Sequence, residues 1–361
     1  MKYMLEPFME THIDLSRLHA HFFPSKRVPD LHTSTATHQK IVNYSQFSVN
    51  ETTLSHKVKR IPGYKDFFSP LEDHEALNVS QLNDAHVMER LPLNEGQRYY
   101  LFTYSDQGAR DLIQVLYSAP TIQILLRNAL SALQHLLFGL RLLNQRDVCF
   151  FDLAPHNIVY LPLREKPVLR NFKFSVNLAH LDYTHLSHIL HKLPSFTYQP
   201  FEIHVLYYFV KHKMVTISHG FIEDFCEEYL ASQHVLRFFS PSFSNRCREQ
   251  CEEMLGRYIN KSRQEIVEDI LERNDKWDVY GVSVLFVHIF ACVARTFSLK
   301  DGVISQLVGE LAKNLHPDSD KRRTLGETLY VVQCLLHEAD WSFVAKLDNS
   351  LLPSLFEELA T

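Results

Sequence analysis

A long apolar segment near the middle of the chain, TIQILLRNALSALQHLLFGLRLLNQ (residues 121–145), constrains the fold more than any other stretch. Apolar residues would cover most of the surface of a helix with this sequence, which predicts a largely buried helix. The sequence places it in a mainly helical region. Helical periodicity is present just before it in ARDLIQVLYS (109–118), and it dominates from Phe201 onward.

The part of the chain before Gly108 has a different pattern. Three stretches predict strands, namely HQKIVNY (38–44), EALNVSQL (75–82) and QRYYLFTYS (97–105). One stretch, ETTLSHKVKRI (51–61), has the apolar spacing of a helix. We therefore predict an α+β fold with a lead-in at 1–35, a small β-rich lobe at 36–105 and a large, mainly helical lobe at 106–361.

The composition limits the function classes. A net charge of -5 argues against a dedicated nucleic-acid binder, because such proteins carry a strong basic excess. Six cysteines without a CxxC pair predict a reduced, intracellular protein of the cytoplasm or nucleus. The first residues lack the apolar core of a secretion signal, and no run of 18 apolar residues predicts a transmembrane segment.

The segment RDVCFFDLAPHNIVYL (146–161) places Asp152 five residues before Asn157, between the buried helix and a predicted strand. Such spacing also occurs in ordinary Asp/Asn turns. The segment resembles the H-R-D-x-x-x-x-N catalytic loop of the protein kinase superfamily. The resemblance implies that Asp152 accepts the proton of a substrate hydroxyl and that Asn157 binds Mg²⁺.

A second metal ligand is expected after the next strand. AHLDYTHLS (179–187) resembles the D-F-G segment in the D-Y-T form of divergent kinases such as haspin, which implies Asp182 as the ligand. This choice requires an enlarged hairpin between Tyr160 and Phe172. A rival alignment places Ser175 to Asn177 there instead, which removes the carboxylate and implies an inactive pseudokinase.

Three further segments resemble architectural motifs of the same superfamily. YQPFEI (198–203) resembles the A-P-E signature and supplies Glu202, and NLHPDSDKRRTLGETL (314–329) supplies Arg322. The resemblance implies a buried ion pair between them. KWDVYGVSVLF (276–286) resembles the helix start whose aspartate, here Asp278, hydrogen-bonds the backbone of the catalytic loop, although Ser283 replaces the usual glycine.

The small lobe matches less closely. The resemblance implies that Lys40, paired with Glu51, contacts the phosphates of ATP and that Phe102 is the gatekeeper. Lys40 also fits any surface lysine, and the aromatic strand also fits a core strand. The backbone groups expected to face adenine are those of Thr103, Tyr104 and Ser105.

Several departures separate the chain from typical kinases. No glycine precedes Gly63, so a Gly-rich loop over the phosphates is missing. Phe150 and Phe151 replace the histidine and arginine of H-R-D, which argues against switching by activation-segment phosphorylation. Ala154 replaces a lysine common in Ser/Thr kinases. A helical insertion at about 205–272 is similar to that of kinase-like proteins of large DNA viruses, and we expect it to bind a protein partner.

The resemblance implies a protein-kinase-like, two-lobe fold with ATP and Mg²⁺ as cofactors. The expected reaction transfers the γ-phosphoryl group to a Ser or Thr hydroxyl of a protein substrate, with Tyr as the less favoured acceptor. The alternative is a pseudokinase that acts as a binding or scaffolding module, which the missing glycines and the two phenylalanines favour. A helical adaptor unrelated to kinases would make the matches at Glu202, Asp278 and Arg322 coincidental.

Overall fold

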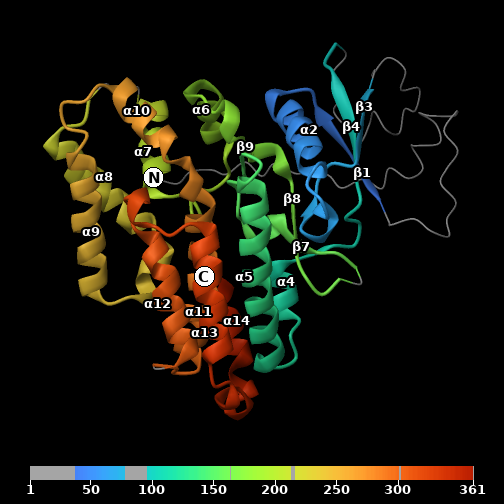
Figure 1. Ribbon diagram of the computed structural model, residues 1–361, viewed down its shortest axis with the longest axis vertical. Helices are drawn as coiled ribbons and strands as arrows, with labels where there is room; N and C mark the ends of the chain where they lie inside the picture. Colours follow the sequence, from blue (N-terminus) through green and yellow to red (C-terminus); the bar gives the residue numbers. More distant parts are fainter. Residues whose placement is uncertain (1–36, 78–95, 163, 213–215, 301, 361) are drawn as a thin grey trace, which may run out of the picture.

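The computed structural model describes residues 37–77, 96–162, 164–212, 216–300 and 302–360. They form an α+β protein in which a β-rich N-terminal region is followed by a largely helical portion (Figure 1). The predicted fold class is therefore confirmed at this level. The expected lead-in at 1–35 and the end of the predicted strand at 75–82 lie outside the described residues.

The N-terminal region is a three-stranded antiparallel sheet with one helix beside it. The strand order is β1 (His38–Asn43), β4 (Tyr99–Tyr104), β3 (Asp73–Leu77). Helix α2 (Gln46–Lys59) follows β1 and begins at a capping box formed by Ser45 and Ser48. The predicted strands at 38–44 and 97–105 and the predicted helix are confirmed, and the helix begins five residues before Glu51.

A second sheet connects the two parts of the chain. Its order is β2 (Phe68–Ser69), β8 (Val168–Arg170), β7 (Ile158–Tyr160), β5 (Arg110–Asp111). The hairpin expected between Tyr160 and Phe172 is present, and its second strand is β8. The sequence pattern missed β8 because the strand has only three residues and follows a charged, Pro-containing turn.

The residues after β8 form short elements. Residues Phe172–Phe174 form a 3₁₀ turn, and β9 (Val176–Asn177) pairs with β6 (Val148–Cys149). Helix α6 (Tyr183–Lys192) follows. Its buried residues Leu186, Ile189 and Leu190 lie on one face, and α6 packs against the next helix.

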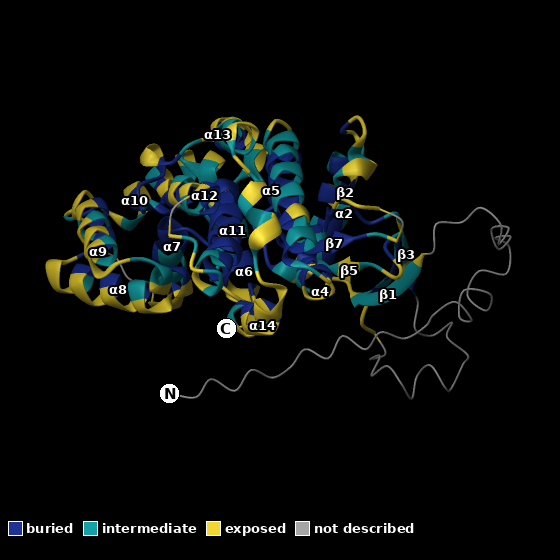
Figure 2. Ribbon diagram, turned by 90° about the horizontal axis from the view of Figure 1, so that it is seen from below, coloured by how far each residue is buried: buried dark blue, intermediate teal, exposed yellow. Residues whose placement is uncertain are grey.

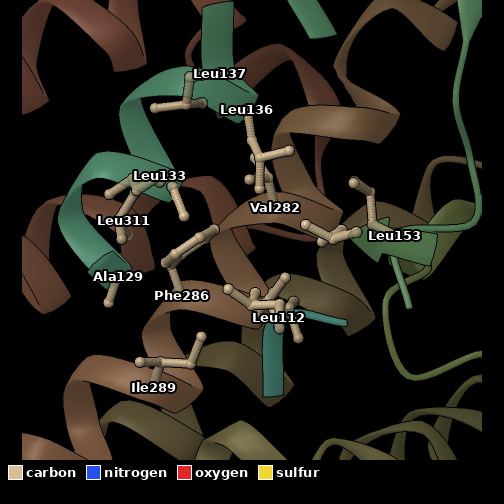
Figure 3. Close-up of a cluster of buried hydrophobic side chains, with 14 of the residues drawn as sticks. Leu112, Ala129, Leu133, Leu136, Leu137, Leu153, Val282, Phe286, Ile289 and Leu311 are labelled. Carbon is tan, nitrogen blue, oxygen red and sulfur yellow. The ribbon is translucent and has the colours of Figure 1, made fainter. Parts of the chain in front are cut away.

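Two apolar helices form the centre of the helical portion. Helix α5 (Ile122–Asn144) is the predicted buried helix, and α11 (Trp277–Thr296) crosses it with nearly every residue buried. Residues 274–296 are long and apolar enough to span a membrane. However, 89% of the apolar 18-residue stretch within them is buried inside the protein, as in a core helix. Figure 3 shows the side chains of this core; those labelled on α5 and α11 are Ala129, Leu133, Leu136, Leu137, Val282, Phe286 and Ile289.

The remaining helices cover this core on two sides. α4 (Leu112–Tyr117), α12 (Val303–Ala312), α13 (Leu325–Glu338) and α14 (Leu352–Ala360) surround α5 and α11. α7 (Phe201–His212), α8 (His219–Ser232), α9 (Pro241–Gly256) and α10 (Arg263–Glu272) have a separate apolar core and form the end of the molecule opposite the N-terminal sheet (Figure 1). The outer faces of α8 and α9 are exposed (Figure 2).

Candidate functional site

The loop with Asp152 and Asn157 is anchored from below by the first turn of α11. The Asp278 carboxylate accepts hydrogen bonds from the backbone N–H of Phe150 and of Phe151, both at 2.8 Å. The Cys149 thiol donates a third, at 3.3 Å. Burial raises the pKa of Asp278, and the backbone hydrogen bonds oppose this shift. This contact is the one that the sequence motif predicts.

The backbone of the loop is strained at one residue and tightly packed at another. Phe151 has φ 68, a left-handed conformation that is uncommon for a non-glycine residue. Its carbonyl accepts a hydrogen bond from Gln199 Nε2 at 2.6 Å. Leu153 extends from the loop toward α11 (Figure 3), where a Cβ on Gly281 would lie 2.9 Å from Leu153 Cδ1 and 2.9 Å from the carbonyl oxygen of Tyr198.

Glu202, in the first turn of α7, forms a buried ion pair with Arg322. Arg322 donates to both oxygens of Glu202, with distances of 2.7 Å from Nη1 and 2.6 Å from Nη2, and the two side chains are 0% and 3% exposed. Burial lowers the pKa of Arg322, but Glu202 more than offsets this effect and the net shift is upward. Bidentate geometry of this kind is typical of strong arginine–carboxylate pairs. The predicted pair is present.

Asp152 and Asn157 lie together, and a third residue joins them. Asn157 Nδ2 donates to the backbone carbonyl of Asp152 at 3.1 Å, and Asn157 Oδ1 accepts from Asn171 Nδ2 at 2.9 Å. Asn171 directly follows β8 and has φ 68, a conformation that asparagine tolerates better than most residues. Sequence reasoning missed Asn171 because it missed β8; the apolar pair Val168–Leu169 was the available signal.

Asp152 is almost completely buried. The residue is 4% exposed, and its Oδ2 atom has no hydrogen-bond partner within the described part of the chain. Burial raises the pKa of this carboxyl, while the charges of His156 and Lys173 and the Asn157 amide act in the opposite direction. A buried carboxylate oxygen without a partner is costly, so the fold does not require it for stability.

The structure does not bring Asp182 into this group, which corrects the sequence-based assignment. Asp182 is exposed and forms the N-cap of α6, where its Oδ1 accepts from the backbone N–H of His185 at 2.8 Å. Aspartate is a preferred residue at this position of a helix. The rival residue Ser175 is buried and donates its hydroxyl to the Phe150 carbonyl at 3.0 Å.

The expected phosphate-contacting residues lie on the elements that the sequence predicted. Lys40 is on β1, paired with Phe102 on β4. Glu51 is on α2 and buried, and its Oε1 accepts from the Tyr104 hydroxyl at 3.0 Å. The pairing of Lys40 with Glu51 stays a prediction. Asn50, the residue before Glu51, fixes α2 to the segment after β8, with Nδ2 donating to the carbonyls of Lys173 and Ser175 at 3.0 and 2.9 Å.

Most of the predicted adenine-facing segment belongs to the sheet. Phe102, Thr103 and Tyr104 are inside β4, the central strand, and Phe102 is fully buried. The Thr103 carbonyl accepts from the backbone N–H of Glu72 at 2.8 Å. Of the three residues predicted to face adenine, only Ser105 lies beyond the strand, and its hydroxyl donates to Glu72 Oε1 at 3.2 Å.

An ion cluster joins the end of β4 to β8. Asp106, with a side chain that is 2% exposed, contacts His38 Nδ1 at 2.7 Å and Arg170 Nη1 at 3.1 Å. Arg170 Nε also donates to the carbonyl of His156 at 3.3 Å. Burial pushes the pKa of Asp106 upward, but the contacts with His38 and Arg170 outweigh it and lower the pKa. Sequence reasoning missed this cluster, since its three members are far apart in the chain.

The residues around Asp152 do not fit a magnesium site. Mg²⁺ prefers carboxylate and water oxygens in a near-octahedral arrangement. Here Asp152 contributes the carboxylate, and the Asn157 and Asn171 amides are hydrogen-bonded to each other. Among the described residues, no group of three His, Cys, Asp or Glu side chains is placed to hold a metal ion.

No known family description matches the sequence, and no curated protein matches it.

Proposed function

We propose that this chain is a pseudokinase, a protein-kinase-like fold that binds a partner protein and does not transfer phosphoryl groups from Mg-ATP. The observation that carries the proposal is Asn171, a neutral amide that hydrogen-bonds Asn157 at the position where a kinase needs the second metal-binding carboxylate. The kinase-like part of the proposal is supported by the order β1, α2, β3, β4, by the contacts of Asp278 and by the pair of Glu202 with Arg322.

Electrostatics explain why one amide matters. Phosphoryl transfer depends on positioning and on neutralising the charge of the phosphates, for which the family uses metal ions bound by an aspartate and an asparagine. Asn171 offers no negative charge, and its Nδ2 is a donor that points at the Asn157 oxygen. A metal ion at Asn157 would have to displace this hydrogen bond and would gain no carboxylate in return.

The ion cluster around Asp106 supports the same proposal. The resemblance puts adenine beside the chain that follows Phe102, between the small and large lobes. In this chain Asp106 is buried there, and Arg170 connects it to β8 and to the backbone of His156. Side chains of the protein itself therefore bridge the region where a nucleotide base is expected.

A protein kinase is the second candidate, and one observation favours it. Asp152 keeps a buried carboxylate with an unpartnered Oδ2, the group that would orient a substrate hydroxyl. Stability alone does not explain an unpartnered buried oxygen. In this candidate Asp152, Asn157, Lys40 and Glu51 keep the roles that the resemblance implies, with a Ser or Thr hydroxyl as acceptor.

Phosphate transfer from labelled ATP to generic protein substrates, with and without Mg²⁺, tests the proposal. We expect the wild type and Asp152→Asn to give equal signals. We also expect this chain not to bind Mg-ATP, so an excess of Mg-ATP should leave the melting temperature unchanged, because a ligand that does not bind cannot stabilise the fold. Asp182→Asn is the matched control and is expected to behave as the wild type. Transfer that depends on Asp152 would reject the pseudokinase and support the kinase.

A further inference from the structure

A cavity of about 330 Å³ opens between α7 and α8, away from the loop with Asp152. Aromatic rings form its walls, contributed by Phe196, Tyr207, Tyr208, Phe225 and Tyr229. We propose that it binds a lysine or arginine side chain from a basic segment of a partner protein. This inference goes beyond the proposed function, since it concerns a surface that is separate from the predicted nucleotide site.

The walls of the cavity suit a cation. The rings contact each other, with centroids 4.3 Å apart for Phe196 and Tyr207 and 5.5 Å apart for Tyr208 and Phe225. Phe196, Tyr207 and Tyr208 are partly exposed, so ring faces remain available to a guest. The negative face of an aromatic ring attracts ammonium and guanidinium groups, most strongly where water is excluded.

The charge of α8 complements a basic partner. The helix carries Glu223, Asp224, Glu227 and Glu228 and no lysine or arginine, and all four residues are exposed. None of them forms an ion pair with another residue in the described ranges. Glu228 lines the cavity, and Asp224 lies one helical turn before it. On α7, Lys211 is the opposing lysine at the rim.

Lys211, His212 and His234 are basic side chains of the lining, whereas the tyrosine hydroxyls beside the cavity are paired within the protein. The hydroxyls of Tyr229 and Tyr280 are 2.9 Å apart, and Tyr280 donates to Gln233 Oε1 at 3.2 Å, so these buried groups are already paired. His204 is half-buried beside the rings, and burial lowers its pKa to about 4, although hydrogen bonds to the Phe196 and Gln199 backbone oppose the shift. At neutral pH this histidine carries no charge that would repel a cation.

Binding of labelled peptides to the full chain, followed by fluorescence anisotropy, tests the inference. Three probes of equal length carry arginine, glutamate or only glycine and serine. We expect the arginine probe to bind most tightly, and Asp224→Lys/Glu228→Lys to weaken it about tenfold, a change of 1.4 kcal/mol. Tyr208→Leu removes a ring but keeps apolar bulk, and is expected to weaken binding about threefold.

Two control variants separate a site effect from a general charge effect. Glu272→Lys/Glu357→Lys makes the same charge change on exposed carboxylates of α10 and α14, and is expected to leave the arginine probe bound as in the wild type. Lys211→Glu is expected to tighten it. Preferential binding of the glutamate probe, equal binding of all three probes, or an unaffected Asp224→Lys/Glu228→Lys variant with a wild-type melting temperature would overturn the inference.

Discussion

The loop with Asp152 has two sides, and they differ in how their polar groups are satisfied. On the α11 side, charged carboxylates accept donors with short distances, as in the contacts of Asp278 with the Phe150 and Phe151 N–H groups and of Glu202 with Arg322. On the β8 side, Asn157 and Asn171 pair as neutral amides, and Asp152 Oδ2 has no partner in the described residues. The hydrogen bonds that hold the loop against α11 are therefore complete, whereas one buried carboxylate oxygen on the β8 side is unpartnered within the described part of the chain.

Breaking the ion pair on the α11 side has the largest expected effect. Arg322→Met leaves Glu202 buried without its partner, and should lower the free energy of unfolding by about 3–5 kcal/mol. Urea denaturation measures this loss. The double variant Arg322→Met/Glu202→Leu removes both charges and should recover most of the stability. A single variant within about 1 kcal/mol of the wild type would contradict the importance of this side.

Weakening the anchor of the loop comes next. Asp278→Asn keeps the shape of the side chain but replaces one acceptor oxygen by a donor, so one backbone N–H of Phe150 or Phe151 loses its partner. We expect a loss of about 1.5–3 kcal/mol, the range for a hydrogen bond to a charged group. Asp275→Asn, on an exposed residue just before α11, is the control. Hydrogen exchange at the two backbone amides should accelerate in Asp278→Asn alone.

Lowering the pH should also destabilise the protein, through His204 on α7. Its folded-state pKa of about 4 lies below the ordinary value of 6.5, so folding favours the neutral form. The corresponding stability is present above pH 6.5 and is lost as the pH falls toward 4. Between pH 7 and pH 5 the wild type should lose about 2 kcal/mol more than His204→Gln. Urea denaturation at the two pH values measures the difference, and equal losses would show that His204 titrates normally.

The β8 side should respond least. Arg170→Ala removes one contact of Asp106, but Arg170 is 33% exposed, so water screens the pair. We expect a loss of about 1 kcal/mol or less at pH 7. Because the pKa of Asp106 is lowered, its stabilising contribution is present above about pH 4 and disappears as the pH falls further. The effect of Arg170→Ala should then shrink progressively as the pH falls below 4, as thermal unfolding can show. A loss as large as that of Arg322→Met would abolish the contrast between the two sides.

The sequence predicted the α11 side better than the β8 side, and the reason is physical. Glu202, Asp278 and Arg322 belong to local sequence motifs, and Glu202 and Asp278 lie in the first turns of helices α7 and α11, which are long enough to be placed from their apolar pattern. Asn171 depends on β8, a strand of three residues that periodicity cannot distinguish from a turn. Asp182 looked like a metal ligand because its neighbours are apolar, but the same pattern suits the N-cap of the amphipathic helix α6.

The ion cluster was beyond sequence reasoning for a different reason. His38, Asp106 and Arg170 are brought together by the pairing of β1 with β4 and of β7 with β8, and no local pattern links them. The sequence correctly placed Lys40 and Phe102 on strands and Glu51 on a helix, because those elements are long enough to recognise. Which side chains meet across them is a property of the tertiary fold.

The close contact at Gly281 gives a way to perturb the loop from a distance. A methyl group there would collide with Leu153 on the loop and with the Tyr198 carbonyl on the segment that leads to α7. Gly281→Ala would therefore act as a wedge between two segments that both border Asp152, while leaving every polar residue of the site in place. The loop can pack this closely on α11 only because residue 281 has no side chain, so this position in α11 should tolerate no larger residue.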